Sequence, residues 1–189
     1  MNISFVGLGK LGLCSAACFA ANGHQVIGVD SNSAIITALN NGKCPINETG
    51  LRDLIEQAKN NISYTENVSY AVANSDITMI IVPTPSQKDG QFSNSYIETA
   101  IRQLAPSLKE KNTFHIVNIV TTVVPGSCDN VFIPLLEQLT EKTCGKDFGV
   151  VYNPEFIALG SVIHDFLNPD LVLIGASDDL SGRTVKDVY

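Results

Sequence analysis

The sequence predicts an α/β fold in which a doubly wound, mostly parallel sheet carries helices on both faces. Two observations lead to this prediction. Strand-like and helix-like segments alternate along the 189 residues, and the strands are continuous apolar runs, such as Asp76–Val82. Runs of that kind are typical of parallel strands that helices cover on both faces. The chain has no internal repeat, low-complexity tract or Gly/Ser linker, so we expect about one domain.

The first four predicted elements alternate between strand and helix. Asn2–Val6 is a short apolar strand that ends in glycines, and Lys10–Ala21 is a helix rich in Ala and Leu that stops at an Asn-Gly pair. Gln25–Val29 is the second strand and ends at an aspartate. Ser31–Asn40 is the second helix, with an N-cap among its first three residues.

The middle of the chain continues the same alternation. Leu51–Lys59 is predicted as a helix, Asn61–Tyr64 as a strand and Val68–Asn74 as a short helix. Asp76–Val82 is a very apolar strand, which a proline-rich loop follows. Asn94–Lys109 is then predicted as a long helix.

The last third of the chain supplies more strands. Thr113–Thr121 is a strand rich in β-branched residues, and Cys128–Thr140 is a helix. Phe148–Tyr152 and Leu171–Ile174 are predicted as two further strands. The tail Ser177–Tyr189 is more polar and is expected to end without a closing element.

The charge and hydropathy of the chain exclude some classes of function. Lys and Arg total 12 against 19 Asp and Glu, a net charge of −7, whereas a duplex nucleic-acid binder normally carries a basic surface. The apolar runs are too short to span a membrane, and no basic lead precedes the first of them. We therefore expect a cytoplasmic protein with no nucleic-acid or membrane partner.

The cysteines and histidines form no predicted metal site. The five cysteines include no CxxC pair and are expected to be free thiols in a reducing compartment. Cys14 and Cys18 share one helix face, where two small buried residues explain the pattern better than a metal pair. His164 beside Asp165 has an orienting carboxylate, yet a surface or capping contact is the favoured interpretation.

A GxGxxG motif after the first strand indicates a dinucleotide site. It comprises Gly7, Leu8, Gly9, Lys10, Leu11 and Gly12, and it opens a helix. Gly7 permits a tight turn, Gly9 lets a pyrophosphate approach the backbone, and Gly12 allows helix and strand to pack closely. The free N–H groups at the helix start would face the diphosphate.

Asp30 strengthens this prediction because it ends the second strand at roughly the expected 20 residues from the glycines. A carboxylate there accepts hydrogen bonds from both ribose hydroxyls, and its charge would repel a 2′-phosphate, so NAD is expected in place of NADP. FAD is an alternative that the absence of a long second domain disfavours. A turn that binds no nucleotide is the purely structural alternative.

Three later stretches each follow a strand, and so belong at the carboxyl edge of the sheet, where doubly wound folds bind ligands. They are the rigid loop Val82–Ser86, the hydroxyl-bearing stretch Thr121–Gly126, and Tyr152–Phe156. Hydroxyls there suit a ribose, a nicotinamide or a bound water, and a carboxylate can act as a general base. Each stretch taken alone also has a structural explanation. The first can be an ordinary turn, the second a pair of strand-forming threonines, and the third a solvated or helix-start glutamate.

In combination, these segments resemble the N-terminal NAD-binding domain of the UDP-glucose/GDP-mannose dehydrogenase family. The resemblance extends in order over nearly the whole chain. The glycine motif is common to many dehydrogenases, whereas the combination of four later stretches is specific to this family: Val82–Pro85, Thr121–Gly126, Tyr152–Phe156, and Asp165–Gly175. The residues at 122–126, and those at 84–86 together with 96–98, are somewhat closer to the GDP-mannose branch.

The resemblance implies an enzyme that oxidises the C6 alcohol of a UDP- or GDP-sugar to the uronate. Such enzymes use NAD twice and pass through a cysteine-bound thiohemiacetal and thioester. The residues implied in NAD binding are Gly7, Leu8, Gly9, Lys10, Leu11, Gly12, Asp30, Val82, Pro83, Thr84, Pro85 and Thr122.

The resemblance also implies catalytic and substrate-binding residues. Thr122 and Glu155 resemble the pair that positions a catalytic water, and Glu155 would then assist hydrolysis of the thioester. The residues implied on the substrate side are Glu155, Phe156 and Ile157.

The chain departs from the family pattern at several places. A basic residue often follows the ribose aspartate by five positions, where this chain has Ile35, and a Glu often stands where this chain has Leu159. Leu159 cannot make the polar contact that Glu would, which puts one cofactor or substrate contact in doubt. The family's nucleophilic Cys, its Lys and its Asn have no counterpart among these residues.

We therefore predict residues 1–176 as a Rossmann-type NAD-binding domain and residues 177–189 as the start of a connection to a C-terminal region that the chain lacks. Such a chain is expected to bind NAD, to turn over no sugar alone, and to form a homodimer when full length. A standalone NAD-binding or sensing module is the alternative. A 3-hydroxyacid-type dehydrogenase shares the glycine motif but gives no reason for the later stretches.

Overall fold

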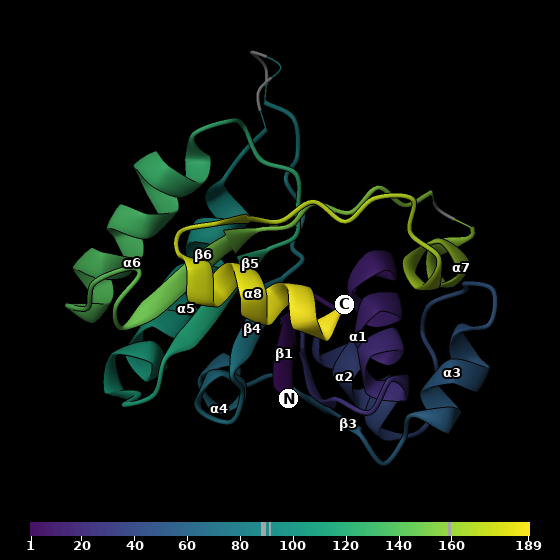
Figure 1. The fold of residues 1–189 in the computed structure, drawn as a ribbon. Coiled ribbons are helices and arrows are strands. Elements are labelled where there is room, and N and C mark those ends of the chain that lie inside the picture. Colours follow the sequence, from purple (N-terminus) through teal and green to yellow (C-terminus); the bar gives the residue numbers. More distant parts are fainter. Residues whose placement is uncertain (88–89, 91, 159) are drawn as a thin grey trace.

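The computed structural model describes residues 1–87, 90, 92–158 and 160–189 of the chain. Strands and helices alternate along most of this length, as the sequence predicts (Figure 1). In chain order the elements are β1 (Asn2–Val6), α1 (Lys10–Ala21), β2 (Gln25–Val29), α2 (Ser33–Asn40), α3 (Leu51–Gln57), β3 (Ile62–Thr65), α4 (Val68–Ala73), β4 (Ile77–Ile80), α5 (Ser95–Glu110), β5 (His115–Ile119), η1 (Cys128–Phe132, a π-helical turn), α6 (Ile133–Thr140), β6 (Phe148–Tyr152), α7 (Val162–Leu167), β7 (Gly175–Ala176) and α8 (Asp179–Val188).

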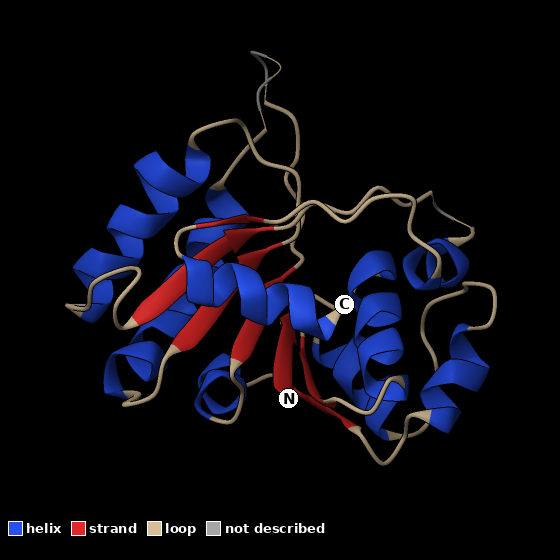
Figure 2. Cartoon of the chain, in the orientation of Figure 1, coloured by secondary structure: helices blue, strands red, loops and turns tan. Residues whose placement is uncertain are grey.

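The described strands form a single seven-stranded sheet in the order β3-β2-β1-β4-β5-β6-β7 (Figure 2). Every pairing from β3 to β6 is parallel, and only the pair of β6 with β7 is antiparallel. β2 lies on one side of β1 and β4 on the other, so the order of the strands reverses at β1. The predicted doubly wound, mostly parallel sheet is therefore confirmed.

Helices cover both faces of the sheet, and each face has its own apolar core. Buried side chains of α1, α2, α3, α7 and α8 belong to the core on one face, and those of α4, α5, η1 and α6 to the core on the other. Phe5 and Leu13 are fully buried in the first core, and Phe132 in the second. Cys14 and Cys18 are buried in the first core, as predicted.

The predicted strand Leu171–Ile174 is wrong. The structure instead has its last strand, β7, at Gly175–Ala176. It pairs with β6 through Val151 opposite Ala176 and Tyr152 opposite Gly175. If this register continued, Leu173 would lie opposite Pro154, which has no N–H to donate to the ladder. The Leu173 carbonyl oxygen instead accepts a hydrogen bond from the Asn153 side chain, whose Nδ2 lies 2.9 Å away.

The tail also differs from the expectation, because most of it forms α8. Asp178 caps the helix by accepting a hydrogen bond from the Ser181 N–H at 2.8 Å. Ser181, Val185 and Val188 are buried, and α8 contacts β6 and β7. In Figure 1 the helix lies across the sheet, and the C-terminal end of the chain lies beside α1. No helix in the described part of the chain is long and apolar enough to cross a membrane.

Gly149 of β6 allows α8 to approach the sheet closely, because a Cβ at this position would lie 1.8 Å from Ser181 Oγ. We expect Gly149→Ala to lower the free energy of unfolding by about 1–3 kcal/mol, the usual cost of over-packing a tight contact. Urea denaturation measures this. Gly175→Ala is the control, because the nearest atom to its Cβ is the Tyr152 carbonyl oxygen at 3.8 Å. Equal losses in the two variants would contradict the close packing of α8.

Candidate functional site

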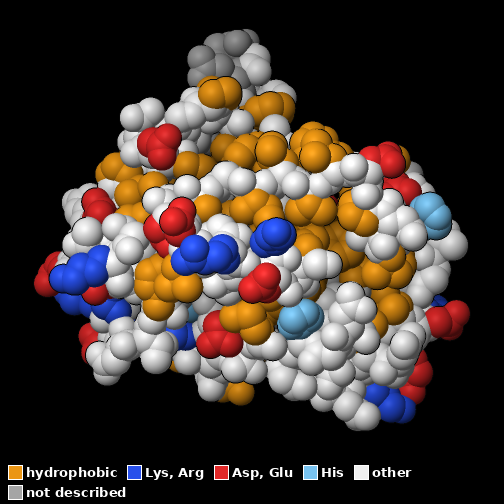
Figure 3. Space-filling model, viewed as in Figure 1, with side chains coloured by type: hydrophobic (Ala, Val, Ile, Leu, Met, Phe, Trp, Pro, Cys, Tyr) orange, Lys and Arg blue, Asp and Glu red, His pale blue; other side chains and the backbone are white. Residues whose placement is uncertain are grey.

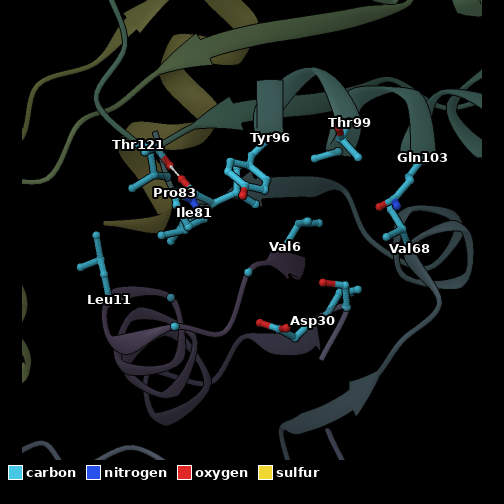
Figure 4. Close-up of a pocket in the computed structure, with 18 of the residues that line it drawn as sticks. Val6, Leu11, Asp30, Val68, Ile81, Pro83, Tyr96, Thr99, Gln103 and Thr121 are labelled. Carbon is cyan, nitrogen blue, oxygen red and sulfur yellow. Dashed lines mark hydrogen bonds between the residues drawn. The ribbon is translucent and has the colours of Figure 1, made fainter. Parts of the chain in front are cut away.

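A cleft of about 1000 Å³ opens at the carboxyl ends of β1, β2, β4 and β5. In the close-up of Figure 4, Asp30 lies on one side of the cleft, and Tyr96, Thr99 and Gln103 project from α5 on another. The glycine motif lines the cleft beside Asp30. Because the cleft lies where the strand order reverses, it occupies the position at which doubly wound sheets bind their ligands.

The three motif glycines lie in different surroundings. Gly7 has a φ of +99°, and a Cβ there would lie 2.2 Å from the Ile81 carbonyl oxygen. A Cβ at Gly12 would lie 1.9 Å from the carbonyl oxygen of Gly7. A Cβ at Gly9 would meet nothing within 4 Å, although Gly9 lines the cleft. Backbone packing thus requires Gly7 and Gly12, whereas Gly9 leaves open space at the start of α1.

Two backbone donors hold the Asp30 carboxylate at the rim of the cleft. Its Oδ2 accepts from the Leu8 N–H and its Oδ1 from the Asn32 N–H, both at 2.8 Å. Each carboxylate oxygen retains a lone pair for a further donor. Leu8 itself is fully buried in the first core and does not line the cleft. Its contribution to the site is therefore its N–H group.

Lys10 lines the cleft at the first position of α1 and is paired with a residue that the sequence prediction gave no role. Its Nζ lies 3.8 Å from Glu48 Oε2, and the Glu48 side chain is only 1% exposed. The other carboxylate oxygen of Glu48 accepts from the Val162 N–H at 3.4 Å. Glu48 therefore joins the segment before α3 to the start of α1 and to α7.

The loops after β4 and β5 are joined to one another. Thr121 Oγ1 donates to the Val82 carbonyl oxygen at 2.9 Å, and Thr84 Oγ1 donates to the Thr122 carbonyl oxygen at 2.9 Å. Val82, Pro83 and Thr122 line the cleft, whereas Thr84 and Pro85 do not. Thr84 therefore contributes to the site through the position of Thr122.

Glu155 follows β6 and lines the same cleft as Thr122, as the sequence predicts for a shared sheet edge. Its Oε1 accepts from the Tyr189 hydroxyl at 2.7 Å. Burial raises the pKa of Glu155 above its ordinary value, and the hydrogen bond from Tyr189 opposes that rise.

The structure does not bring every predicted residue to the cleft. Phe156 is 62% exposed and Ile157 packs against the first core, and neither lines the cleft. Ile35 also packs against that core and does not line the cleft. Leu159 lies outside the described residues.

Some of the lining residues were given no role in the site by the sequence prediction. Tyr96, Thr99 and Gln103 lie on the exposed side of the amphipathic helix α5, and only the fold shows that this side borders the cleft. His164 contacts Asp165 at 3.2 Å on the exposed surface, which agrees with the favoured interpretation of that pair. Among the residues that the structure describes, no three His, Cys, Asp or Glu side chains gather as metal ligands.

The sheet order, the glycine loop and the carboxylate at the end of β2 together define a dinucleotide-binding α/β domain. Comparison with known proteins gives the family. Residues 1–189 match the model of the UDP-glucose/GDP-mannose dehydrogenase family, NAD binding domain, and the chain belongs to this family.

Relatives and solved structures agree with this assignment. The chain is 41% identical to the GDP-mannose 6-dehydrogenase of Pseudomonas aeruginosa and 35% identical to the UDP-glucose 6-dehydrogenase of Haloferax volcanii. It covers 44% of each relative, with 100% of its own length matched. A crystal structure of a ternary complex of the P. aeruginosa GDP-mannose dehydrogenase superposes with a TM-score of 0.97, matching 100% of this chain and 44% of that one. The chain therefore spans less than half the length of these relatives.

The different surroundings of the glycines predict different effects of adding a methyl group. Gly12→Ala should lower the free energy of unfolding by about 1–3 kcal/mol, because its Cβ would collide with the Gly7 carbonyl oxygen. Gly9→Ala should change it by less than about 0.5 kcal/mol, because its Cβ enters open space. Urea denaturation compares the two variants. A larger loss for Gly9→Ala would show that the description of the loop is wrong.

Proposed function

We propose that this chain is the NAD-binding part of a nucleotide-sugar 6-dehydrogenase, an enzyme that oxidises the C6 alcohol of a UDP- or GDP-sugar to the uronate. The observation that carries the proposal is the convergence on one cleft of the open glycine loop, the carboxylate of Asp30 and the pair Thr122 and Glu155. Membership of the family adds support.

The residues present fit a bound NAD. The absence of a Cβ at Gly9 leaves room for a diphosphate against the first N–H groups of α1, where the helix dipole favours negative charge. Lys10 would add a positive charge on the same side of the cleft. Asp30 would accept the ribose hydroxyls and repel a 2′-phosphate. When bound, NAD supplies the acceptor for the hydride that leaves the alcohol carbon.

Thr122 and Glu155 would serve the hydrolytic half of the reaction. A hydroxyl and a carboxylate on the wall of one cleft can hold a water between them, and the carboxylate can take a proton from that water. A half-buried carboxylate whose pKa is raised is a better proton acceptor than an exposed one.

The isolated chain is proposed to bind NAD and to turn over no sugar. A thioester mechanism needs a reactive thiolate at the site, and no cysteine lines the cleft in the described part of the chain. Burial is the largest cause that raises the pKa values of Cys14 and Cys18 to about 12 and that of Cys128 to about 11. Such thiols stay protonated near neutral pH. A standalone NAD-binding or sensing module is the alternative, because it requires the same cofactor residues without a nucleophile.

The sugar nucleotide is proposed to carry guanine. The GDP-mannose 6-dehydrogenase relatives are 40–41% identical to the chain, whereas two UDP-glucose 6-dehydrogenase relatives are 35% and 37% identical. This order agrees with the branch that the residues at 122–126 favour.

Calorimetric titration with NAD tests the proposal. We expect the wild-type chain to bind NAD more tightly than NADP, and Asp30→Ala to weaken NAD binding at least about tenfold, a loss of about 1.4 kcal/mol. Gly9→Ala should weaken binding to a similar extent while its stability is unchanged, because its Cβ would occupy the diphosphate position.

The control variant removes an exposed carboxylate that does not line the cleft. Asp129→Ala should bind NAD within twofold of wild type. Absence of binding by the wild-type chain, or full binding by Asp30→Ala, would refute the proposed cofactor site.

A further inference from the structure

The Glu155 carboxylate depends on a residue from a remote part of the chain. Among the described residues, the hydrogen-bond donor to this carboxylate is the Tyr189 hydroxyl, 2.7 Å from Oε1. Tyr189 directly follows α8, the helix that the sequence did not predict. Tyr189 does not line the cleft, so its contact with Glu155 comes from behind the cleft wall.

The Tyr189 ring is fixed by contacts with two helices. It packs edge-on against Phe19 of α1, with ring centroids 5.3 Å apart. It also packs against Phe166 of α7 in a tilted arrangement, with ring centroids 5.7 Å apart. Phe19 and Phe166 also contact each other at 5.4 Å. These three rings hold the hydroxyl in place independently of its hydrogen bond to Glu155.

Asn153 gives the hydroxyl a second acceptor. Its Oδ1 lies 2.7 Å from the Tyr189 oxygen and 3.2 Å from the Nδ2 of Asn118, which donates to it. The other end of the Asn153 amide donates to the Leu173 carbonyl oxygen. Since that carbonyl can only accept, the amide cannot flip, and the phenol faces two acceptors, Asn153 and Glu155.

The single phenol proton serves these two acceptors unequally. A hydrogen bond to an ionised carboxylate is about twice as strong as one to a neutral amide oxygen, so the proton points to Glu155 when Glu155 is ionised. When Glu155 is protonated, it can donate to the phenol oxygen, and the phenol proton turns to Asn153. The donor thus favours the ionised carboxylate, which burial alone disfavours.

The charged groups around Glu155 do not replace this donor. The titratable groups that face it from the elements packed against it are Tyr189 and the Cys18 thiol of α1. Burial, and then the charge of Glu155, raise the pKa of both groups, so each stays protonated. No lysine, arginine or histidine in the described part of the chain forms an ion pair with Glu155.

We propose that Tyr189 is a positioning residue for Glu155: its hydroxyl fixes the direction of the carboxylate and supplies the donor that the ionised form needs at the cleft wall. The proposal rests on the proposed function, in which Glu155 is the acid–base group of the site. It assigns the end of α8 a part in that site beyond its part in the fold.

The test is the titration of Glu155 in the 189-residue chain. Carbon-13 NMR of the glutamate side-chain carboxyls follows their protonation against pH, and Glu155→Gln identifies the Glu155 signal. We expect Tyr189→Phe, which keeps the ring and removes the hydroxyl, to move the Glu155 titration midpoint upward by about one pH unit. Tyr70→Phe is the matched control, because Tyr70 is 54% exposed on α4. In this variant the Glu155 titration midpoint should equal that of the wild-type chain.

A second substitution keeps the test decisive if Tyr189→Phe fails to fold. Incorporation of 3-fluorotyrosine at position 189 makes the phenol a stronger donor and should lower the midpoint. A midpoint that does not move with either substitution in a folded chain would overturn the proposal.

NAD binding by the same wild-type sample separates this proposal from the proposed function. If the midpoint moves as expected but the wild-type chain does not bind NAD, the proposed function fails and the pairing of Tyr189 with Glu155 stands. If the wild-type chain binds NAD but the midpoint does not move, the positioning role of Tyr189 fails alone.

Discussion

The contact between Gly12 and the carbonyl of Gly7 is the constraint on which the cleft depends. With no Cβ at Gly12, the first turn of α1 lies directly against the loop that leaves β1. The start of α1 then faces the cleft, and the Leu8 N–H reaches the carboxylate of Asp30. The glycine loop and the acid at the end of β2 are therefore one rigid unit, placed where the strand order reverses.

The second half of the chain completes the cleft from the other side. β5 and β6 extend the parallel sheet, so the loops that carry Thr122 and Glu155 end at the same edge as the glycine loop. The antiparallel β7 then turns the chain back toward α8. Figure 3 shows hydrophobic side chains gathered on the face where α8 and the residues before β7 lie. Leu171 and Leu173 before β7, and Leu180 in α8, are exposed.

Much of the fold and part of the site could be predicted from the sequence, because both depend on local signals. β1, α1, β2 and β6 have the predicted bounds, since an apolar run and its polar or glycine ends fix them. Cleft residues such as Asp30 and Thr122 were found because each follows a parallel strand, and such strands end at one edge. α8 was missed because most of its residues are polar or charged and only Ser181, Val185 and Val188 are buried. β7 was misplaced because Pro154 lies where Leu173 would pair. The cleft side of α5 and the contact of Tyr189 depend on packing between distant segments, which no local pattern reports.

The docking of α8 joins the folding equilibrium of one helix to the proposed acid–base role of Glu155. A partial opening that releases α8 leaves β1, α1 and the glycine loop paired within the sheet, yet it removes the donor from Glu155. Such an opening would give two kinds of molecule, which share the glycine loop and differ in whether Glu155 keeps its hydrogen-bond donor. Amide hydrogen exchange in α8 would then report the fraction of molecules in which Glu155 keeps its Tyr189 donor.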